Sequence, residues 1–372
     1  MSNEYKVCTR CIMDTTDPEI KFGDKGVCNH CRQYNITAKK YLFSGKDGER
    51  RLQDLFLKVR QSGMNKPYDC IMGLSGGVDS TYVAYIAKKQ GLRPLAVHLD
   101  NGWNSELAVK NIENIVRKLD LDLYTHVIDW VEFRDLQISF FKAGVIDIEM
   151  LTDHAITAIL YRLASKHGIK YILSGSNMAT EGIMPTSWTH RKSDLRNIKA
   201  IHNRYGKEQM KSFPTASTFQ IYFWYLLIKR MKSIRVLDYI DYNKEMAMSI
   251  IEKELGWKSY GIKHYESIFT RFYQGFILPS KFDVDKRKAH LSTLICSGQI
   301  SRAEALKEIK KNAYDHEVLA SDKDFVLKKL GFGEKQFEEY VKSKPKAHFD
   351  YGSDEYFFKV LRVLSEILYT KT

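Results

Sequence analysis

The sequence contains no apolar run long enough to span a bilayer, and its first residues include no hydrophobic stretch typical of a secretory signal peptide. Internal repeats and low-complexity tracts are also absent. These absences argue against an integral membrane protein, an exported protein and a repeat architecture. We therefore expect a cytoplasmic globular protein without a membrane partner.

Acidic residues are in deficit, since 58 Lys and Arg against 45 Asp and Glu leave a net charge of +13. This excess suits an anionic partner such as nucleic acid, a nucleotide-linked substrate or a membrane surface. The basic residues are scattered, however, with modest clusters at 286–288 and 342–346, which is more typical of a solvated surface than of a nucleic-acid footprint. We expect no stable nucleic-acid partner.

The length and composition favour several folded units. A chain of 372 residues is long for one domain, so two or three units are expected. The hydrophobic content of 44% and the aromatic content of 12% support a substantial core, and 28% charged residues is ordinary for a globular protein.

Cysteine is scarce, with six residues, but four of them form two C-x2-C pairs separated by sixteen residues: Cys8, Cys11, Cys28 and Cys31. Two such knuckles predict a tetrahedral thiolate site for Zn²⁺. Because all four positions are filled, we expect a closed, structural site whose metal drives the folding of a short zinc-ribbon-like module. An iron–sulfur cluster is the alternative, and the neighbouring His30 is interpreted as a bystander.

A phosphate-binding turn is predicted where the apolar run 68–74 ends in Ser-Gly-Gly before a helix at 78–89. The N–H groups at a helix start attract anions, and glycines let the backbone approach a ligand closely. The Asp79 carboxylate would repel bare phosphate, so it indicates Mg²⁺ between protein and ligand. The lysine of the G-x-x-x-x-G-K-[ST] loop is missing, and an ordinary turn is the alternative. The candidate ligand-binding residues here are Ser75, Gly76, Gly77, Asp79 and Ser80.

Strand and helix patterns alternate through residues 63–186. The predicted elements after the loop are strands at 93–99, 121–128 and 170–173 and helices at 104–119 and 151–167. This alternation is typical of a parallel, doubly wound α/β sheet, whose ligands bind beyond the carboxyl ends of the strands. Asp100 follows the second strand. It is a candidate for contacting the adenosine or the metal, and the alternative is a turn without a ligand. Asp153 and His154 open the second helix, where they face the site or only cap the helix.

The Ser-Gly-Gly-Val-Asp-Ser loop resembles the pyrophosphate loop (PP-loop) of the ATP pyrophosphatases, which include GMP, NAD and asparagine synthetases and tRNA-thiolating enzymes. The resemblance implies an adenine nucleotide alpha hydrolase-like fold and adenylation chemistry, with ATP and Mg²⁺ as cofactors. The Gly/Ser turn after the fourth strand is similar to the Gly-Thr-Asn…Glu stretch of NAD synthetase-like enzymes. That similarity implies ligand contacts for Ser176 and Asn177 and metal binding for Glu181.

The second half of the chain loses the alternation. Residues 187–194 are polar, aromatic and unassigned, and residues 218–231 predict a buried helix. Residues 257–306 are rich in Lys, Arg, His and Tyr without helical periodicity, as a diphosphate-linked sugar would require. The domain prediction is a zinc-ribbon-like cysteine module at 1–35, a linker helix at 36–62, a PP-loop ATP-binding domain at 63–186, a substrate-binding region at 187–312 and a helical tail at 313–372. The C-terminal region is expected to be mostly helical.

Taken together, the knuckles, the loop, the stretch His98-Leu99-Asp100-Asn101-Gly102-Trp103-Asn104 and the basic-aromatic block resemble the N-acetyl sugar amidotransferases of lipopolysaccharide and nonulosonic-acid biosynthesis. The resemblance implies conversion of an N-acetyl amide on a nucleotide-linked sugar to an acetamidino group, through an imidate adenylate that ammonia attacks. The implied catalytic residues are Asp79, Glu181, Lys286 and Arg287. Further basic candidates for substrate contact are Lys263, His264, Lys281 and His290.

The sequence contains no evident nucleophilic cysteine of the kind that a glutaminase site needs. Cys70 lies in a predicted core strand and Cys296 in an apolar context, so both are interpreted as inert packed residues. We therefore expect ammonia from a separate glutaminase, and the resemblance implies a partner like the glutaminase and cyclase pair of histidine biosynthesis. The alternative function is tRNA thiolation, which shares the loop but usually needs a catalytic cysteine pair or an iron–sulfur site.

Overall fold

A five-stranded parallel β-sheet lies at the centre of this computed structural model, which describes residues 4–260 and 266–369, with the backbone alone for residue 362 and residues 364–369. The strand order is β3-β2-β1-β4-β5, and all neighbours pair in parallel. The strands are β1 (Cys70–Gly73), β2 (Pro94–Asp100), β3 (Asp122–Val127), β4 (Tyr171–Ser174) and β5 (Lys232–Arg235). The predicted doubly wound parallel sheet is confirmed.

The strand order reverses beside β1. The chain proceeds outward from β1 to β2 and β3, then returns to place β4 and β5 on the other side. Such a reversal opens a crevice at the carboxyl ends of the two flanking strands, here β1 and β4. The register pairs Met72 with Leu173, so the loops that follow these two strands emerge side by side.

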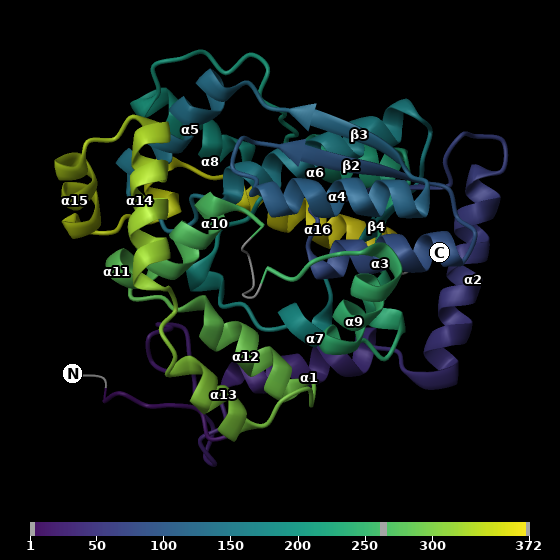
Figure 1. The fold of residues 1–372 in the computed structure, drawn as a ribbon, viewed down its shortest axis with the longest axis horizontal. Coiled ribbons are helices and arrows are strands. Elements are labelled where there is room, and N and C mark those ends of the chain that lie inside the picture. Colours follow the sequence, from purple (N-terminus) through teal and green to yellow (C-terminus); the bar gives the residue numbers. More distant parts are fainter. Residues whose placement is uncertain (1–3, 261–265, 370–372) are drawn as a thin grey trace.

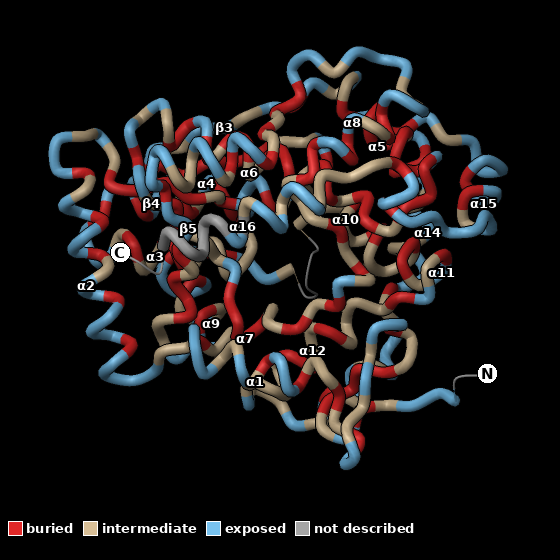
Figure 2. The backbone as a smooth tube through the Cα atoms, turned by 180° about the vertical axis from the view of Figure 1, so that it is seen from behind, coloured by how far each residue is buried: buried red, intermediate tan, exposed pale blue. Residues whose placement is uncertain are grey.

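Helices cover both faces of the sheet (Figure 1). They are α3 (Val78–Lys89), α4 (Glu106–Leu119), α5 (Trp130–Ala143) and α6 (Met150–Lys166). Alternate strand residues enter different cores because successive side chains point to opposite faces. Ile71 and Val97 pack in the core that contains α5 and α6, whereas Met72 and Ala96 pack in the core that contains α3 and α4. Figure 2 shows buried stretches of chain in the strands and in the helices packed on them.

The N-terminal segment packs against the C-terminal half of the chain. Its helices are α1 (Asn29–Tyr41) and α2 (Gly45–Gly63), with a break between them inside the stretch 36–62 that was predicted as a linker helix. The break follows from Ser44 and Gly45, where Gly45 adopts a positive φ of 54°. In Figure 1, α1 lies beside α12 (Lys286–Cys296), and the contacts between the two helices agree.

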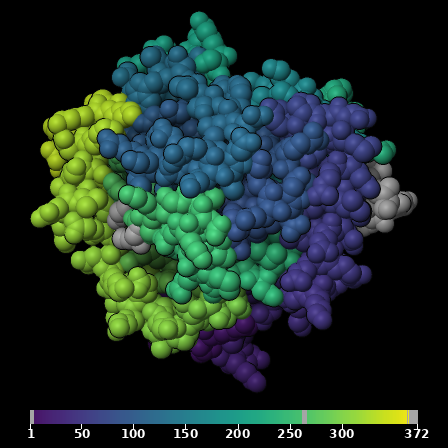
Figure 3. All heavy atoms as spheres, turned by 45° about the vertical axis from the view of Figure 1, so that its right-hand side comes forward, coloured from purple at the N-terminus to yellow at the C-terminus, as the bar shows by residue number. Residues whose placement is uncertain are grey.

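The predicted mostly helical C-terminal region is confirmed, and residues 268–282, 286–296 and 302–309 of the basic-aromatic block are helical although their sequence lacks helical periodicity. The first elements of the C-terminal half are α7 (Met178–Glu181), η1 (Thr186–Trp188), α8 (Leu195–Tyr205), η2 (Gln220–Ile228), η3 (Val236–Tyr239) and α9 (Lys244–Leu255). They are followed by α10 (Ile268–Phe272), η4 (Tyr273–Ile277), α11 (Leu278–Phe282), α12 and α13 (Arg302–Ile309). The tail contains α14 (His316–Leu330), α15 (Glu334–Lys342), η5 (His348–Tyr351) and α16 (Glu355–Tyr369). Figure 3 shows these green to yellow segments packed against the blue segments of the sheet domain.

The helix predicted to be buried at 218–231 is instead a short π-helical segment near the surface. Of η2, only Ile221 is buried, while Phe223 and Trp224 are exposed. The short segment that follows forms β5 at the sheet edge. Among the described residues, no helix is both long and apolar enough to cross a bilayer.

Candidate active site

The PP-loop connects β1 to α3 at the strand reversal. Gly76 adopts a φ of +79°, and a Cβ there would lie 3.2 Å from the Ala108 carbonyl oxygen. The Gly76 carbonyl accepts hydrogen bonds from Trp257 Nε1 at 2.7 Å and from the Tyr260 hydroxyl at 3.0 Å. These two bonds hold the Gly76 carbonyl against the segment that follows α9.

Two serine hydroxyls close the loop on itself. Ser75 Oγ and Ser80 Oγ lie 3.1 Å apart, and Ser80 donates to the Gly77 carbonyl at 3.2 Å. Gly77 is the N-cap of α3, whose aligned peptide dipoles favour negative charge at this end. The donor set fits a nucleotide phosphate chain.

The loop after β4 lies against the same helix start. A Cβ on Gly175 would be 3.0 Å from the Ser80 backbone nitrogen, so only glycine permits this approach. Ser176 is exposed and lines the adjoining cavity. Asn177 is buried and caps α7 by accepting from the Thr180 N–H at 2.8 Å, which gives it a structural role rather than a place in the cavity wall.

Two carboxylates meet at the phosphate end. The Tyr242 hydroxyl donates to Asp79, and burial, with the charges of Asp79 and Glu181, holds the pKa of Tyr242 well above its usual range. Both carboxylates line the cavity beside the loop. Carboxylate oxygens next to a phosphate site are the ligands that Mg²⁺ takes in nucleotide enzymes, so Asp79 and Glu181 fit such an ion.

Two cavities of about 730 and 600 Å³ adjoin at the crevice. The first contains the PP-loop, the β4 loop and Lys244 of α9. The second extends past the end of β2 to Gln274, Lys286 and His290 from the C-terminal half. Residues common to both walls are Gly73, Ser75, Asp153, Ile156, Glu181, Lys192 and Glu266. The two spaces therefore share a boundary at the PP-loop.

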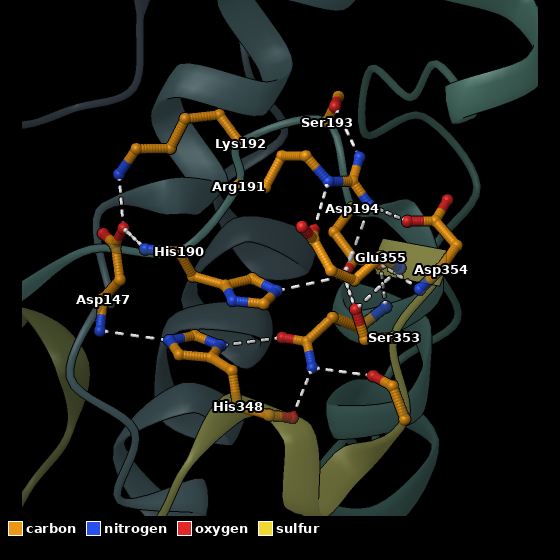
Figure 4. A network of polar contacts seen from close by, with 12 residues as sticks. Asp147, His190, Arg191, Lys192, Ser193, Asp194, His348, Ser353, Asp354 and Glu355 are labelled. Atoms are coloured by element: carbon orange, nitrogen blue, oxygen red, sulfur yellow. Dashed lines mark hydrogen bonds and ion pairs between the residues drawn. The ribbon is translucent and has the colours of Figure 1, made fainter. Parts of the chain in front are cut away.

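Lys192 lies on this boundary. Its Nζ is 2.5 Å from Asp147 Oδ2 (Figure 4). The same atom is 3.3 Å from Asp153 Oδ2. Asp147 is fully buried, and the attraction between the two charges lowers the pKa of Asp147 and raises that of Lys192 despite desolvation. The lysine is thus held as a cation at the junction of the cavities.

Several residues expected at the site lie elsewhere. Asp100 binds its own turn, accepting from the Gly102 N–H at 2.9 Å, and is not among the described residues that line either cavity. The Arg287 side chain pairs with Asp285 and the Lys311 carbonyl, also away from these walls.

Two other candidates, Lys281 and His154, form hydrogen bonds to backbone groups inside the protein. The Lys281 ammonium donates to the carbonyls of Tyr340 and Ser343 at 2.6 and 2.7 Å, and burial lowers its pKa to about 8. His154 is buried and accepts from the Ala216 N–H, so Asp153 alone of that pair faces the cavities. The candidates Lys263 and His264 lie outside the described residues.

Sequence reasoning missed Lys192, Tyr242, Lys244 and Glu266 as site residues. Lys192 lies in the stretch 187–194, for which the sequence showed no assignable pattern. Its partner Asp147 is 45 residues away, and no local spacing reveals such a pair.

The four N-terminal cysteines converge as the spacing predicts. Their sulfur atoms lie within 4.8 Å of one another, with Cys8 and Cys31 at 3.9 Å and Cys11 and Cys28 at 3.7 Å. A tetrahedral zinc site with bonds of about 2.3 Å places its sulfurs roughly 3.8 Å apart, so the cluster fits Zn²⁺. The described side chains offer no open position there, since all four thiols are buried.

The cysteine module rests on the helix that reaches into the second cavity. Ile12 N–H donates to Ser292 Oγ of α12 at 3.2 Å, and Lys288 of the same helix forms a 2.6 Å ion pair with Asp14. Arg302 donates to the Cys8 and Cys11 carbonyls at 3.1 Å. The module therefore supports the element that carries Lys286 and His290.

Two family models match separate parts of the chain. Residues 50–216, which contain the PP-loop and the β4 loop, match NAD synthase. Residues 266–365 match the family described as "LPS biosynthesis protein WbpG-like, C-terminal domain". The chain joins an NAD synthase-like PP-loop domain to a WbpG-like C-terminal domain. This confirms both the resemblance to PP-loop enzymes and the resemblance to a lipopolysaccharide-biosynthesis family. The two matches support an ATP-dependent ligase of the amidotransferase type.

Solved structures match part of the chain at low sequence identity. They include NMN synthetase from Francisella tularensis (14% identity, 59% of this chain and 100% of that one, TM-score 0.31). NH3-dependent NAD synthetase from Campylobacter jejuni is similar at 12% identity, over 56% of this chain and 94% of that one, with a TM-score of 0.29. No curated protein matches the sequence. The domain boundaries and the roles of individual site residues stay predictions.

Proposed function

We propose that the chain is an ATP-dependent amidotransferase that converts the N-acetyl group of a nucleotide-linked sugar to an acetamidino group in surface polysaccharide synthesis. The observation that carries this proposal is the pair of cavities that adjoin at the PP-loop. One cavity is lined by the PP-loop and the β4 loop, and the other is lined in part by residues of the WbpG-like domain. An acceptor in the second cavity would therefore meet the phosphate chain held in the first.

The reaction follows from the weak leaving ability of an amide oxygen. That oxygen forms a bond to the α-phosphorus of ATP, the bond from this phosphorus to the bridging oxygen breaks, and pyrophosphate leaves with the electron pair. Ammonia then adds to the imidate carbon, and AMP leaves with the former amide oxygen. The sum is amide, ammonia and ATP to amidine, AMP and pyrophosphate.

The protein supplies position and charge. Backbone N–H groups of the loop and the Ser75 and Ser80 hydroxyls would hold the phosphates, because preorganised donors stabilise charge that develops on transferring phosphoryl groups. Asp79 and Glu181 would hold Mg²⁺, which supplies positive charge beside the phosphate oxygens. The cysteine module would hold a structural Zn²⁺ through Cys8, Cys11, Cys28 and Cys31.

The nitrogen donor is proposed to be ammonia from a separate glutaminase of the histidine-biosynthesis type. Cys70 is fully buried in β1, and Cys296 lies 3.7 Å from Cys31 beside the cysteine module. Neither thiol is among the described residues that line the two cavities. This arrangement also disfavours tRNA thiolation, which needs a sulfur carrier near the loop.

The test is incubation of the purified protein with ATP, Mg²⁺, ammonium salt and a panel of UDP-N-acetyl sugars. We expect acceptor-dependent AMP formation and a product whose mass matches replacement of O by NH. Sulfur incorporation into tRNA, with no AMP formed from any sugar nucleotide, would instead favour the thiolation alternative. A variant pair of Cys70→Ser and Cys296→Ser should keep the amidation activity.

A further inference from the structure

Lys192 is the one lysine, among the described residues, that lines both cavities. Lys244 lines only the first and Lys286 only the second. The Lys192 side chain is 32% exposed, so its ammonium reaches the shared boundary while one side is fixed by Asp147. A cation in this position is adjacent to whatever bridges the two spaces.

The partner of Lys192 is itself firmly held. Asp147 Oδ2 accepts from the Thr189 hydroxyl at 2.8 Å and from the His190 N–H at 2.7 Å, and the Asp147 N–H donates to His348 Nε2 at 3.2 Å. His348 in turn donates from Nδ1 to Asn197 Oδ1 at 2.8 Å, which fixes the neutral tautomer. The carboxylate therefore has one orientation, and so does the lysine bound to it.

This support comes from both family-matched parts of the chain. The rings of His190 and His348 stack with centroids 4.3 Å apart and planes 5° from parallel (Figure 4). Asp194 accepts from His190 Nε2 at 3.0 Å and from the Ser353 hydroxyl, while Arg191 pairs with Asp354 and Glu355. The segment 347–355 of the WbpG-like domain thus clamps the segment 189–194 that carries Lys192.

We propose that Lys192 is a catalytic residue that contacts the α-phosphate oxygens at the junction of the cavities, and that Asp147 and the 347–355 clamp are its positioning elements. The proposal rests on the proposed function. In the first step the amide oxygen joins the α-phosphorus as pyrophosphate leaves, and in the second AMP leaves the tetrahedral carbon. Negative charge develops on the oxygens around the α-phosphorus in both steps, and a fixed ammonium stabilises it in both.

The other groups around Lys192 agree with this role. Asp153 and Glu149 are the further acidic groups whose charges keep the ammonium protonated, and Lys286 acts on Asp147 from the second cavity. The acidic surroundings would repel a phosphate unless cations offset them. Lys192, together with Mg²⁺ held by Asp79 and Glu181, would provide that positive charge.

The primary test compares Lys192→Met, Lys192→Arg and the exposed control Lys199→Met of α8. The first step is followed as acceptor-dependent exchange of labelled pyrophosphate into ATP without ammonia, and ATP binding by calorimetry. We expect Lys192→Met to lower the exchange rate by about 100-fold, as for loss of one transition-state donor, with the ATP Kd changed by less than about threefold. Lys192→Arg should retain more exchange, and Lys199→Met should match wild type.

A second variant separates catalysis from folding. Lys192→Met leaves the Asp147 charge buried without its partner, which destabilises a protein. The double variant with Asp147→Asn removes that charge, so its melting temperature should recover toward wild type while its exchange rate stays low. Recovery of exchange in the double variant would overturn the catalytic role.

Asp147→Asn alone tests the positioning role through the pH profile. Without the carboxylate, burial is expected to lower the pKa of Lys192, so the exchange rate should fall at alkaline pH where wild type stays constant. A profile parallel to wild type would contradict the positioning role.

The outcomes also separate this proposal from the proposed function. If wild type amidates an acceptor and Lys192→Met does so within threefold, the lysine proposal is wrong and the function stands. An increase in acceptor KM at unchanged kcat would likewise make Lys192 a binding residue only. If wild type forms no AMP with any acceptor, the proposed function is wrong, and the catalytic role of Lys192 falls with it.

Discussion

The two cavities are built in different ways. The first includes two Gly/Ser loops that follow adjacent parallel strands and whose backbones lie close together at Gly175 and Ser80. The second takes its polar groups from side chains on several elements, including Gln274, Lys286 and His290 of the C-terminal half. Loops whose backbones lie close together are sensitive to any added Cβ, whereas a side-chain site is sensitive to the chemistry of single residues. The difference suggests that phosphate binding is the fixed part of the reaction and acceptor recognition the adjustable part.

The largest expected effect is on the first cavity. Gly76→Ala adds a Cβ within about 3.2 Å of neighbouring atoms at a positive φ, so the loop must move. We expect AMP formation to fall by about 100-fold or more, with an increased ATP Kd measured by calorimetry. Gly331→Ala is the control, because its φ is also positive but no atom lies within 4 Å of the added Cβ. An equal loss of activity in both variants would contradict the explanation that the close contacts of the added Cβ at Gly76 cause the loss.

Metal removal should act on the second cavity through α12. Cys28→Ser, or treatment with a strong chelator, should release one zinc per chain, measured by atomic absorption, because a closed thiolate site needs all four ligands. Loss of the module removes the support for α12, so we expect acceptor turnover to fall by about tenfold or more while the ATP Kd stays near wild type. Iron in place of zinc would favour the cluster alternative, and an equal loss of ATP binding would contradict the division between the cavities.

A single side chain in the second cavity should give a selective effect. Lys286→Met removes a cation that lies 5.3 Å from the Tyr273 ring and faces the cavity. Loss of one charge-assisted contact is worth about 1.5–3 kcal/mol, so the KM for the acceptor should rise by about tenfold or more with the KM for ATP little changed. Lys307→Met, exposed on α13, is the matched control. A rise in the KM for ATP alone would contradict the assignment of Lys286 to the acceptor cavity.

The smallest effect concerns stability at the clamp between the cavities. Burial, with the charges of His190 and Lys192, lowers the pKa of His348 to about 3, against the opposing effects of Asp147 and Asp194. The unfolded chain binds this proton near pH 6.5, so the unfolded state holds more protons between about pH 6.5 and 3, and stability falls as the pH falls through that window. His348→Gln should therefore lose less stability than wild type between pH 7 and 5, by up to about 1.4 kcal/mol per pH unit.

The measurement for this prediction is urea unfolding at several pH values. His316→Gln, at the exposed start of α14, is the control and should keep the wild-type slope. An unchanged slope in His348→Gln would mean that the buried ring does not resist protonation in the folded protein.

The sequence predicted the features that depend on local patterns and missed those that depend on contacts made by the fold. The PP-loop, the helix at 78–89 and the cysteine knuckles are contiguous patterns with local physical causes, so their elements were placed nearly residue for residue. The helices of the basic-aromatic block were missed because they are short and start from Ser and Asp caps rather than from a long apolar stripe. Lys192 was missed because its meaning depends on Asp147 and on residues 347–355, which only the fold brings near.

The most direct test of the central claim uses an acceptor sugar whose acetyl carbonyl carries ¹⁸O. If the α-phosphorus of ATP is captured by the amide oxygen, the label must appear in the phosphate of AMP, in an amount equal to the amidine formed, with none in pyrophosphate. Unlabelled AMP, or cleavage of ATP to ADP and orthophosphate, would contradict the account of the two cavities as one adenylation site.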